Sequence, residues 1–122
     1  ETRPRKMYQL SPLGKEILID WLKGPLRDNE ILDERDIVLI KFLFAETILD
    51  RDEVIGFLNR YEALTESYDT GRRVFYELAM GESSLHQQLI HESTLMEINT
   101  LRTWIQMARR RLYAESSRNA EE

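Results

Sequence analysis

The chain has 122 residues, of which 42% are hydrophobic and 32% are charged, and a chain of this length is large enough to bury one core. It contains no cysteine, which excludes disulfides, thiolate metal sites and cysteine nucleophiles. No apolar run approaches the roughly 18 residues of a membrane span, and the first residues lack the apolar core of a signal peptide. We therefore expect a soluble, cytoplasmic protein without a membrane partner.

The net charge of −5 at pH 7 argues against a surface that binds nucleic acid along its whole length. Positive charge is concentrated at the N-terminal end: residues 1–15 carry a net charge of +3, so the rest of the chain carries −8. Any contact with phosphate is expected at this end.

The first elements expected are a short strand and a helix. Residues 5–10 (RKMYQL) largely alternate polar and apolar side chains, which favours a half-buried strand. Ser11-Pro12 predicts a helix start, because the Ser hydroxyl can cap free N–H groups and Pro suits the first turn. This helix is expected over about 12–22 and ends at Gly24-Pro25, since Gly suits a C-terminal cap and Pro cannot continue the helix.

Two further helices are expected between Asp33 and Leu78. The first begins near Asp33 or Glu34 and is apolar on nearly all sides, so it should lie inside, in contact with several neighbours. Residues 50–53 (DRDE) are close to a capping box and predict the start of the next helix. Its apolar residues then alternate steps of three and four, which indicates a coiled-coil-like seam. Gly71 interrupts the seam, either to allow a close helix approach or as a weak point.

A fourth helix is expected after Gly81, capped by Ser83 or Ser84 and running to about Glu115. At 1.5 Å per residue, its roughly 30 residues would extend about 45 Å. That length exceeds what a globule of this size comfortably buries and points to a partner chain. Residues 116–122 are polar and predict a flexible tail.

These elements predict an all-α fold in which long antiparallel helices form a dimeric helical bundle or coiled-coil-like domain, with a residual N-terminal β-strand. The expected organisation is a strand segment over 1–10, a linking helix over 11–23, a helical dimerisation domain over 24–115 and the tail over 116–122. The apolar stripes of the two long helices supply the candidate residues of a homodimer interface: Val54, Phe57, Tyr61, Leu64, Tyr68, Phe75, Leu95, Ile98, Leu101, Ile105 and Leu112.

The order of features over residues 5–22 resembles PadR-family transcriptional regulators of bacteria. A basic strand RKMYQL is followed by SPLG at a helix start and WL near the helix end, and the family's winged helix closes with a strand of the type R-x-Y-x-L-T-x-x-G. Residues 39–45 (LIKFLFA) are similar to the family's Leu/Phe-rich run. The two long helices are similar in length and pattern to its C-terminal, virulence-activator-like dimerisation domain. Ser11 stands where the family commonly has Thr, and either hydroxyl can cap.

The resemblance implies that residues 1–10 are the last wing strand and that Arg3, Arg5 and Lys6 contact phosphate or the minor groove, contacts that position a protein without specifying sequence. The alternative for these side chains is a solvated strand end. No helix-turn-helix precedes the strand, so the helix that would read the major groove is missing from these residues. We expect a fragment whose parent binds DNA through its winged helix, with repression or activation, and the operator, left open.

No enzymatic activity, cofactor or metal site is expected. His86 and His91 are the only histidines and lie five residues apart on one helix, so they face different sides and cannot share a metal. The sequence His91-Glu92 lacks the second His of a metalloprotease motif. Neither the Glu-x-x-His of di-iron bundles nor a glycine-rich phosphate loop occurs.

Some PadR-like regulators sense aromatic small molecules, so the resemblance makes Trp21, Tyr68 and Trp104 candidates for an effector pocket. Aromatic residues at helical spacing more often form core or interface. The alternative function is a helical protein–protein interaction adaptor unrelated to transcription, in which the exposed seam binds a different protein.

Overall fold

The structure, a computed structural model, describes residues 11–79, 81 and 83–121. The elements in chain order are α1 (Pro12–Lys23), the 3-10 helix η1 (Asp28–Glu30), α2 (Arg35–Ile48), α3 (Arg51–Ala79) and α4 (Leu85–Glu121). The predicted all-α class is confirmed. The predicted N-terminal strand and the candidate DNA contacts Arg3, Arg5 and Lys6 lie outside the described residues.

Side-chain caps start three of the four α-helices where the sequence predicts them. Ser11 Oγ accepts a hydrogen bond from the Gly14 N–H at 3.0 Å. Asp50 and Glu53 form a reciprocal capping box, with Asp50 Oδ1 accepting from the Glu53 N–H at 2.8 Å and Glu53 Oε1 accepting from the Asp50 N–H at 3.2 Å. Ser84 makes the same exchange with Gln87 at the start of α4. These bonds satisfy N–H groups that a helix start otherwise leaves free.

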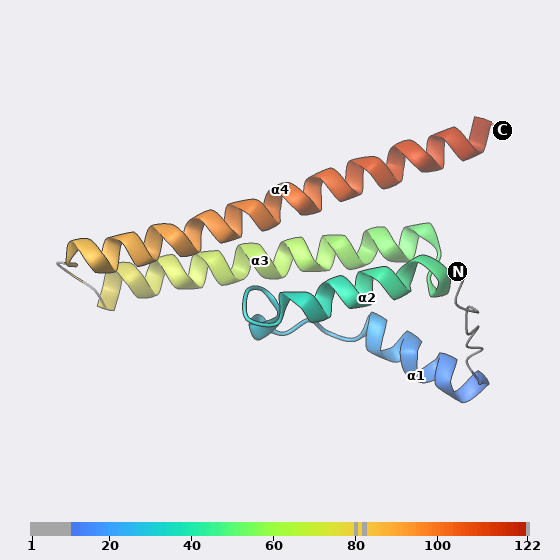
Figure 1. Ribbon diagram of the computed structural model, residues 1–122, viewed down its shortest axis with the longest axis horizontal. Helices are drawn as coiled ribbons and strands as arrows, with labels where there is room; N and C mark the ends of the chain where they lie inside the picture. The colour runs from blue at the N-terminus through green and yellow to red at the C-terminus, as the bar shows by residue number, and fades with distance from the viewer. Residues whose placement is uncertain (1–10, 80, 82, 122) are drawn as a thin grey trace, which may run out of the picture.

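The dominant feature is an antiparallel hairpin of α3 and α4 (Figure 1). At 1.5 Å per residue, the 29 residues of α3 extend about 43 Å and the 37 residues of α4 about 55 Å. Gly81 in the connection has φ 41°, a conformation that glycine adopts without steric cost. Helices α1 and α2 lie at the opposite end of the hairpin (Figure 1), which we call the base; the end near Gly81 is the tip.

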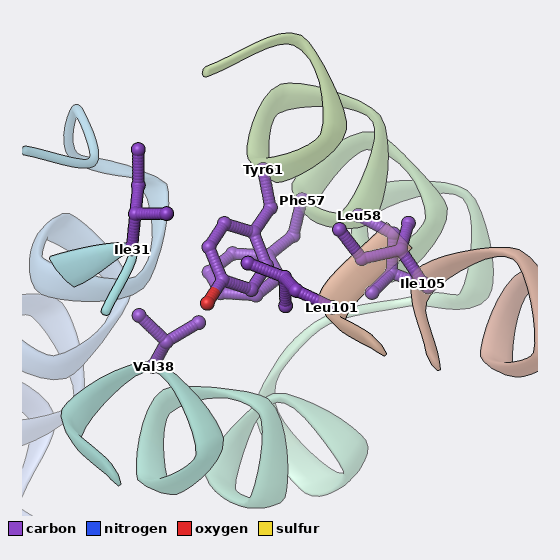
Figure 2. Packing of buried hydrophobic residues seen from close by; sticks show 7 residues of the cluster. All are labelled: Ile31, Val38, Phe57, Leu58, Tyr61, Leu101 and Ile105. Atoms are coloured by element: carbon purple, nitrogen blue, oxygen red, sulfur yellow. The ribbon is translucent and has the colours of Figure 1, made fainter. Parts of the chain in front are cut away.

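The core lies at the base, where α2 and η1 pack on the groove between α3 and α4. Its cluster of buried side chains comes from the turn after η1, from α2, from α3 and from α4 (Figure 2): Ile31, Val38, Phe57, Leu58, Tyr61, Leu101 and Ile105. Tyr61 is fully buried, and its hydroxyl reaches the Glu30 carbonyl at 3.5 Å. Burial raises the pKa of Tyr61 to about 12, because the charged form would be poorly solvated there.

Helix α2 was expected to be buried on nearly all sides, and the structure differs from this expectation. Its inner face buries Val38 and Ala45, and the outer face leaves Leu43 64% exposed and Phe44 46% exposed. Figure 1 shows α2 between α3 and α1, and among the described residues these helices and η1 leave the face with Leu43 and Phe44 uncovered. The sequence of α2 is thus apolar over more of its circumference than the described part of the chain buries.

Two helix ends also differ from the sequence expectation. Gly24 after α1 is extended, with φ −65° and ψ 164°, and what it requires is space, because a Cβ there would lie 3.1 Å from the Asp20 carbonyl oxygen. Helix α4 continues through the predicted tail to Glu121. The segment AESSRNAE holds no Gly or Pro, so nothing in it stops a helix.

Candidate protein interaction surface

Exposed apolar side chains occur both at the tip and on the outer sides of α1 and α2. We call the following side chains, which are between 53% and 82% exposed, the tip face: Phe75, Leu78, Leu85, Leu89 and Met96. Val74 and Ile90 are exposed beside them. Large contiguous apolar patches are uncommon on monomeric proteins and mark interaction sites. The tip face is therefore the leading candidate for a functional surface of this chain.

A polar cluster between base and tip fixes α3 against α4. Asp69 is 3% exposed and accepts hydrogen bonds from Arg72 at 2.9 Å and from Arg102, with Arg73 Nη2 at 3.1 Å. Arg102 also binds both carboxylate oxygens of Glu66. Such multiply bonded ion pairs hold a defined geometry, so the hairpin presents the tip face in a fixed register.

The same cluster shifts the acidity of its carboxylates. Burial would raise the pKa of Asp69, but the hydrogen bonds from Arg102 and Arg72 and the nearby positive charge outweigh it and hold the pKa below its ordinary value. The hydrogen bond from Arg102 likewise lowers the pKa of Glu66. Both carboxylates are thus charged at neutral pH and serve as structural acceptors.

Next to this cluster, Arg72 Nη1 lies 2.6 Å from His91 Nδ1, and the His91 ring stacks on Tyr76 with 4.0 Å between ring centroids. His91 and Tyr76 therefore extend the contact between α4 and α3 toward the tip. Among the described residues, no group of three or more His, Cys, Asp or Glu side chains is arranged as a metal site.

A buried ion pair joins the α1 end of the chain to the core. Lys41 Nζ lies 3.1 Å from Glu30 Oε2, with the two side chains only 6% and 8% exposed. Lys41 Nζ also lies 5.0 Å from the ring centroid of Trp21 on α1, within the range of a cation–π interaction. The sequence analysis did not identify this pair, since a Lys within an apolar run and a Glu in a loop give no signal that they meet.

The outward sides of α1 and α2 are also apolar. Leu13 and Ile17 on α1 are 66% and 61% exposed, and Trp21 is 38% exposed. On α2, Leu39, Ile40, Leu43 and Phe44 are 38% to 64% exposed. This second apolar surface lies at the base, on the layer outside the α3–α4 hairpin.

The candidate interface residues divide between core and surface. Those buried inside the single chain are Val54, Phe57, Tyr61, Ile98, Leu101 and Ile105. Those partly exposed are Leu64, Tyr68, Leu95 and Leu112, and Phe75 is 66% exposed. The seam on α3 thus serves the core of one chain at the base and emerges at the surface toward the tip, and its role in a dimer stays a prediction.

The candidate effector residues lie in different places. Trp104 packs edge-on against Phe42, with 5.3 Å between ring centroids, and Trp21 lies against Lys41. Tyr68 lines a cavity of about 340 Å³ beside η1. A larger cavity of about 630 Å³, between α2 and the C-terminal half of α4, is lined by none of the three. The structure does not bring these aromatic side chains together, and an effector role stays a prediction.

Among the helices of the described residues, none has the length and apolar composition needed to cross a bilayer.

A comparison of the chain with family models, curated proteins and solved structures gives no match. The likeness to PadR-like regulators therefore depends on the sequence features of residues 5–45 and on the helix pattern after them.

Proposed function

We propose that this chain is the dimerising helical domain of a PadR-like DNA-binding transcriptional regulator. The observation that carries the dimer is the tip face, a set of exposed apolar side chains on α3 and α4. Water-exposed apolar area of this kind is removed most simply by association. Helix α1 would then link the dimer to a winged helix, and the two-fold axis would set the spacing of two such winged helices on an operator.

The support for regulation is the geometry of α1. The Lys41–Glu30 pair and the Trp21 contact fix the inner side of α1, while Leu13 and Ile17 on its outer side are exposed. In the proposed protein, a change in the angle between α1 and the dimer would change whether both recognition helices fit the major groove at once.

The first test is the oligomeric state. At about 10 μM, a typical self-association of this kind predicts a sedimenting mass twice the 14.5 kDa of the chain. A stable monomer at that concentration would remove the dimer and leave the tip face to a different protein, the adaptor function.

The second test asks whether the dimer supports DNA binding. The chain is fused to a DNA-binding domain that holds its operator only as a dimer, and repression of a reporter is measured. The proposal predicts repression by the fusion and none by the DNA-binding domain alone. A fusion that is expressed but does not repress would contradict the proposed role.

A further inference from the structure

One stripe of α3 is covered at the base and uncovered at the tip. Phe57 and Tyr61 are buried against Ile31 and Val38, and Tyr68, further along, is partly buried against the same cluster. Phe75 and Leu78 follow at steps of seven and three and are 66% and 82% exposed. Because residues at these steps share a face of a helix, the exposed residues continue the surface on which η1 and α2 pack.

Helix α4 shows the same change from covered to uncovered. Trp104 contacts Phe42 of α2, and the side of α4 that includes Met96 and Leu89 lines a cavity of about 540 Å³ together with Leu32 and Arg35. This cavity marks the point where the layer formed by η1 and α2 ends. Leu89, at the edge of this cavity, is 53% exposed, and Leu85 beyond it is 66% exposed.

The cause is a difference in length. The 14 residues of α2 extend about 21 Å, roughly half of the 43 Å of α3. Figure 1 shows α2 beside the base half of α3, whereas α4 is the one described helix beside the tip half. The described part of the chain therefore leaves about 20 Å of the α3–α4 hairpin, the part that carries the tip face, without a second helical layer.

We propose that the tip face of a second copy fills this space, in an antiparallel dimer whose two tips overlap. Each tip would then lie in the same layer as its partner's α2 and end beside the partner's η1. This inference rests on the proposed function and names its interface and its orientation.

Sterics favour the antiparallel arrangement. A parallel pair would bring the two α2 helices face to face and hold the tip faces apart by two helix layers, roughly 20 Å. Antiparallel pairing places α2 of each copy beyond the end of the other copy's tip, so the tips meet directly. The α2 helices thus act as stops that set the register.

The exposed area of the tip face reaches the lower limit expected of a specific interface. Exposures of 53% to 82% on side chains of about 150–200 Å² give roughly 100 Å² for each of the five tip-face residues. Two copies would bury about 1,000 Å² of apolar surface before the rim is counted, and a specific interface needs at least about that area. Gly71 lies on the same stripe, and a Cβ there meets nothing within 4 Å of its own chain.

The interface is tested by matched substitutions of exposed leucines. In the proposed dimer, Leu89 lies near the two-fold axis, so Leu89→Lys should raise the dissociation constant at least about 100-fold. The matched control is Leu43→Lys on the outer side of α2, where Leu43 is 64% exposed, and it should change the constant less than about 3-fold. Both sites are exposed in the single chain, and circular dichroism checks that each variant stays folded.

The orientation of the two copies is tested by pairs of introduced cysteines. Because the chain has no native cysteine, only the introduced ones can form a disulfide. Leu32→Cys and Leu85→Cys variants are mixed and oxidised. Antiparallel overlap predicts disulfide-linked heterodimers and few homodimers of Leu32→Cys, since a disulfide needs Cα atoms within about 7 Å.

The outcomes separate this inference from the proposed function. A dimer that survives Leu89→Lys, or that gives no Leu32–Leu85 link, would overturn the tip overlap and leave dimerisation standing. A wild-type chain that is monomeric at about 10 μM would overturn both.

Discussion

Replacing Lys41 with Met tests the coupling between α1 and the core. Lys41 and Glu30 form a buried pair, and Met fills a similar volume without the charge. Glu30 would remain buried, with the Arg27 N–H at 3.1 Å as its remaining donor among the described contacts. Removing one partner of a buried pair costs about 3–5 kcal/mol, and because one donor to Glu30 remains, we expect a loss of about 3 kcal/mol.

The assay is urea unfolding followed by circular dichroism, at one protein concentration for all variants. If the free energy of unfolding falls by about 2 kcal/mol per molar urea, a loss of about 3 kcal/mol lowers the urea concentration at the unfolding midpoint by roughly 1.5 M. The control is Lys23→Met, which makes the same chemical change in the exposed pair with Glu53, where the side chains are 51% and 33% exposed. Exposed pairs contribute at most about 1 kcal/mol. If Lys41→Met costs no more than Lys23→Met, the buried pair does not stabilise the α1 end as argued.

Three further changes follow from the geometry of α3. Asp69→Asn should destabilise the chain at neutral pH, and the difference in stability from wild type should shrink as the pH falls from about 5 to about 2. The reason is that Asp69 has a lowered pKa in the folded state and loses its ion pair with Arg102 when it is protonated. A difference that stays constant with pH in urea titrations would contradict this. Gly71→Ala should raise the free energy of unfolding of the dissociated chain by up to about 1 kcal/mol, since the added Cβ meets nothing within 4 Å. A loss of stability, measured by calorimetry at low protein concentration, would argue against an open site. Asp50→Ala should cost about 1 kcal/mol, because the Glu53 N–H loses its acceptor; an unchanged urea midpoint would mean that water replaces the cap fully.

The helix starts could be predicted because their causes are local. Ser11, Asp50 and Ser84 each accept a hydrogen bond from an N–H group three residues ahead, a relation that sequence spacing alone specifies. The end of α4 was not predicted, because a polar composition was interpreted as a flexible tail. Polarity shows that a segment is solvated, and a solvated segment without Gly or Pro can still be helical.

The position of the candidate surface could be predicted only in part. Periodicity placed Phe57, Tyr61 and Phe75 on one stripe, and the structure agrees that they share a face. The periodicity of the sequence could not show where along that stripe α2 ends. Which residues α2 covers depends on the relative lengths of helices that meet in three dimensions. For the same reason, the burial of Lys41 beneath Trp21 could not be predicted from either residue's neighbours in sequence.

The most direct measurement is the distance between spin labels at Tyr113→Cys in the two copies of the dimer. Tyr113 is 54% exposed, near the base, and lies 24 residues along α4 from Leu89. With the two-fold axis near Leu89, a rise of 1.5 Å per residue places the two labels about 70 Å apart. Pulsed dipolar spectroscopy should give a single population near that distance, whereas a distance below about 30 Å, as for two bases side by side, would contradict the overlap of the tips.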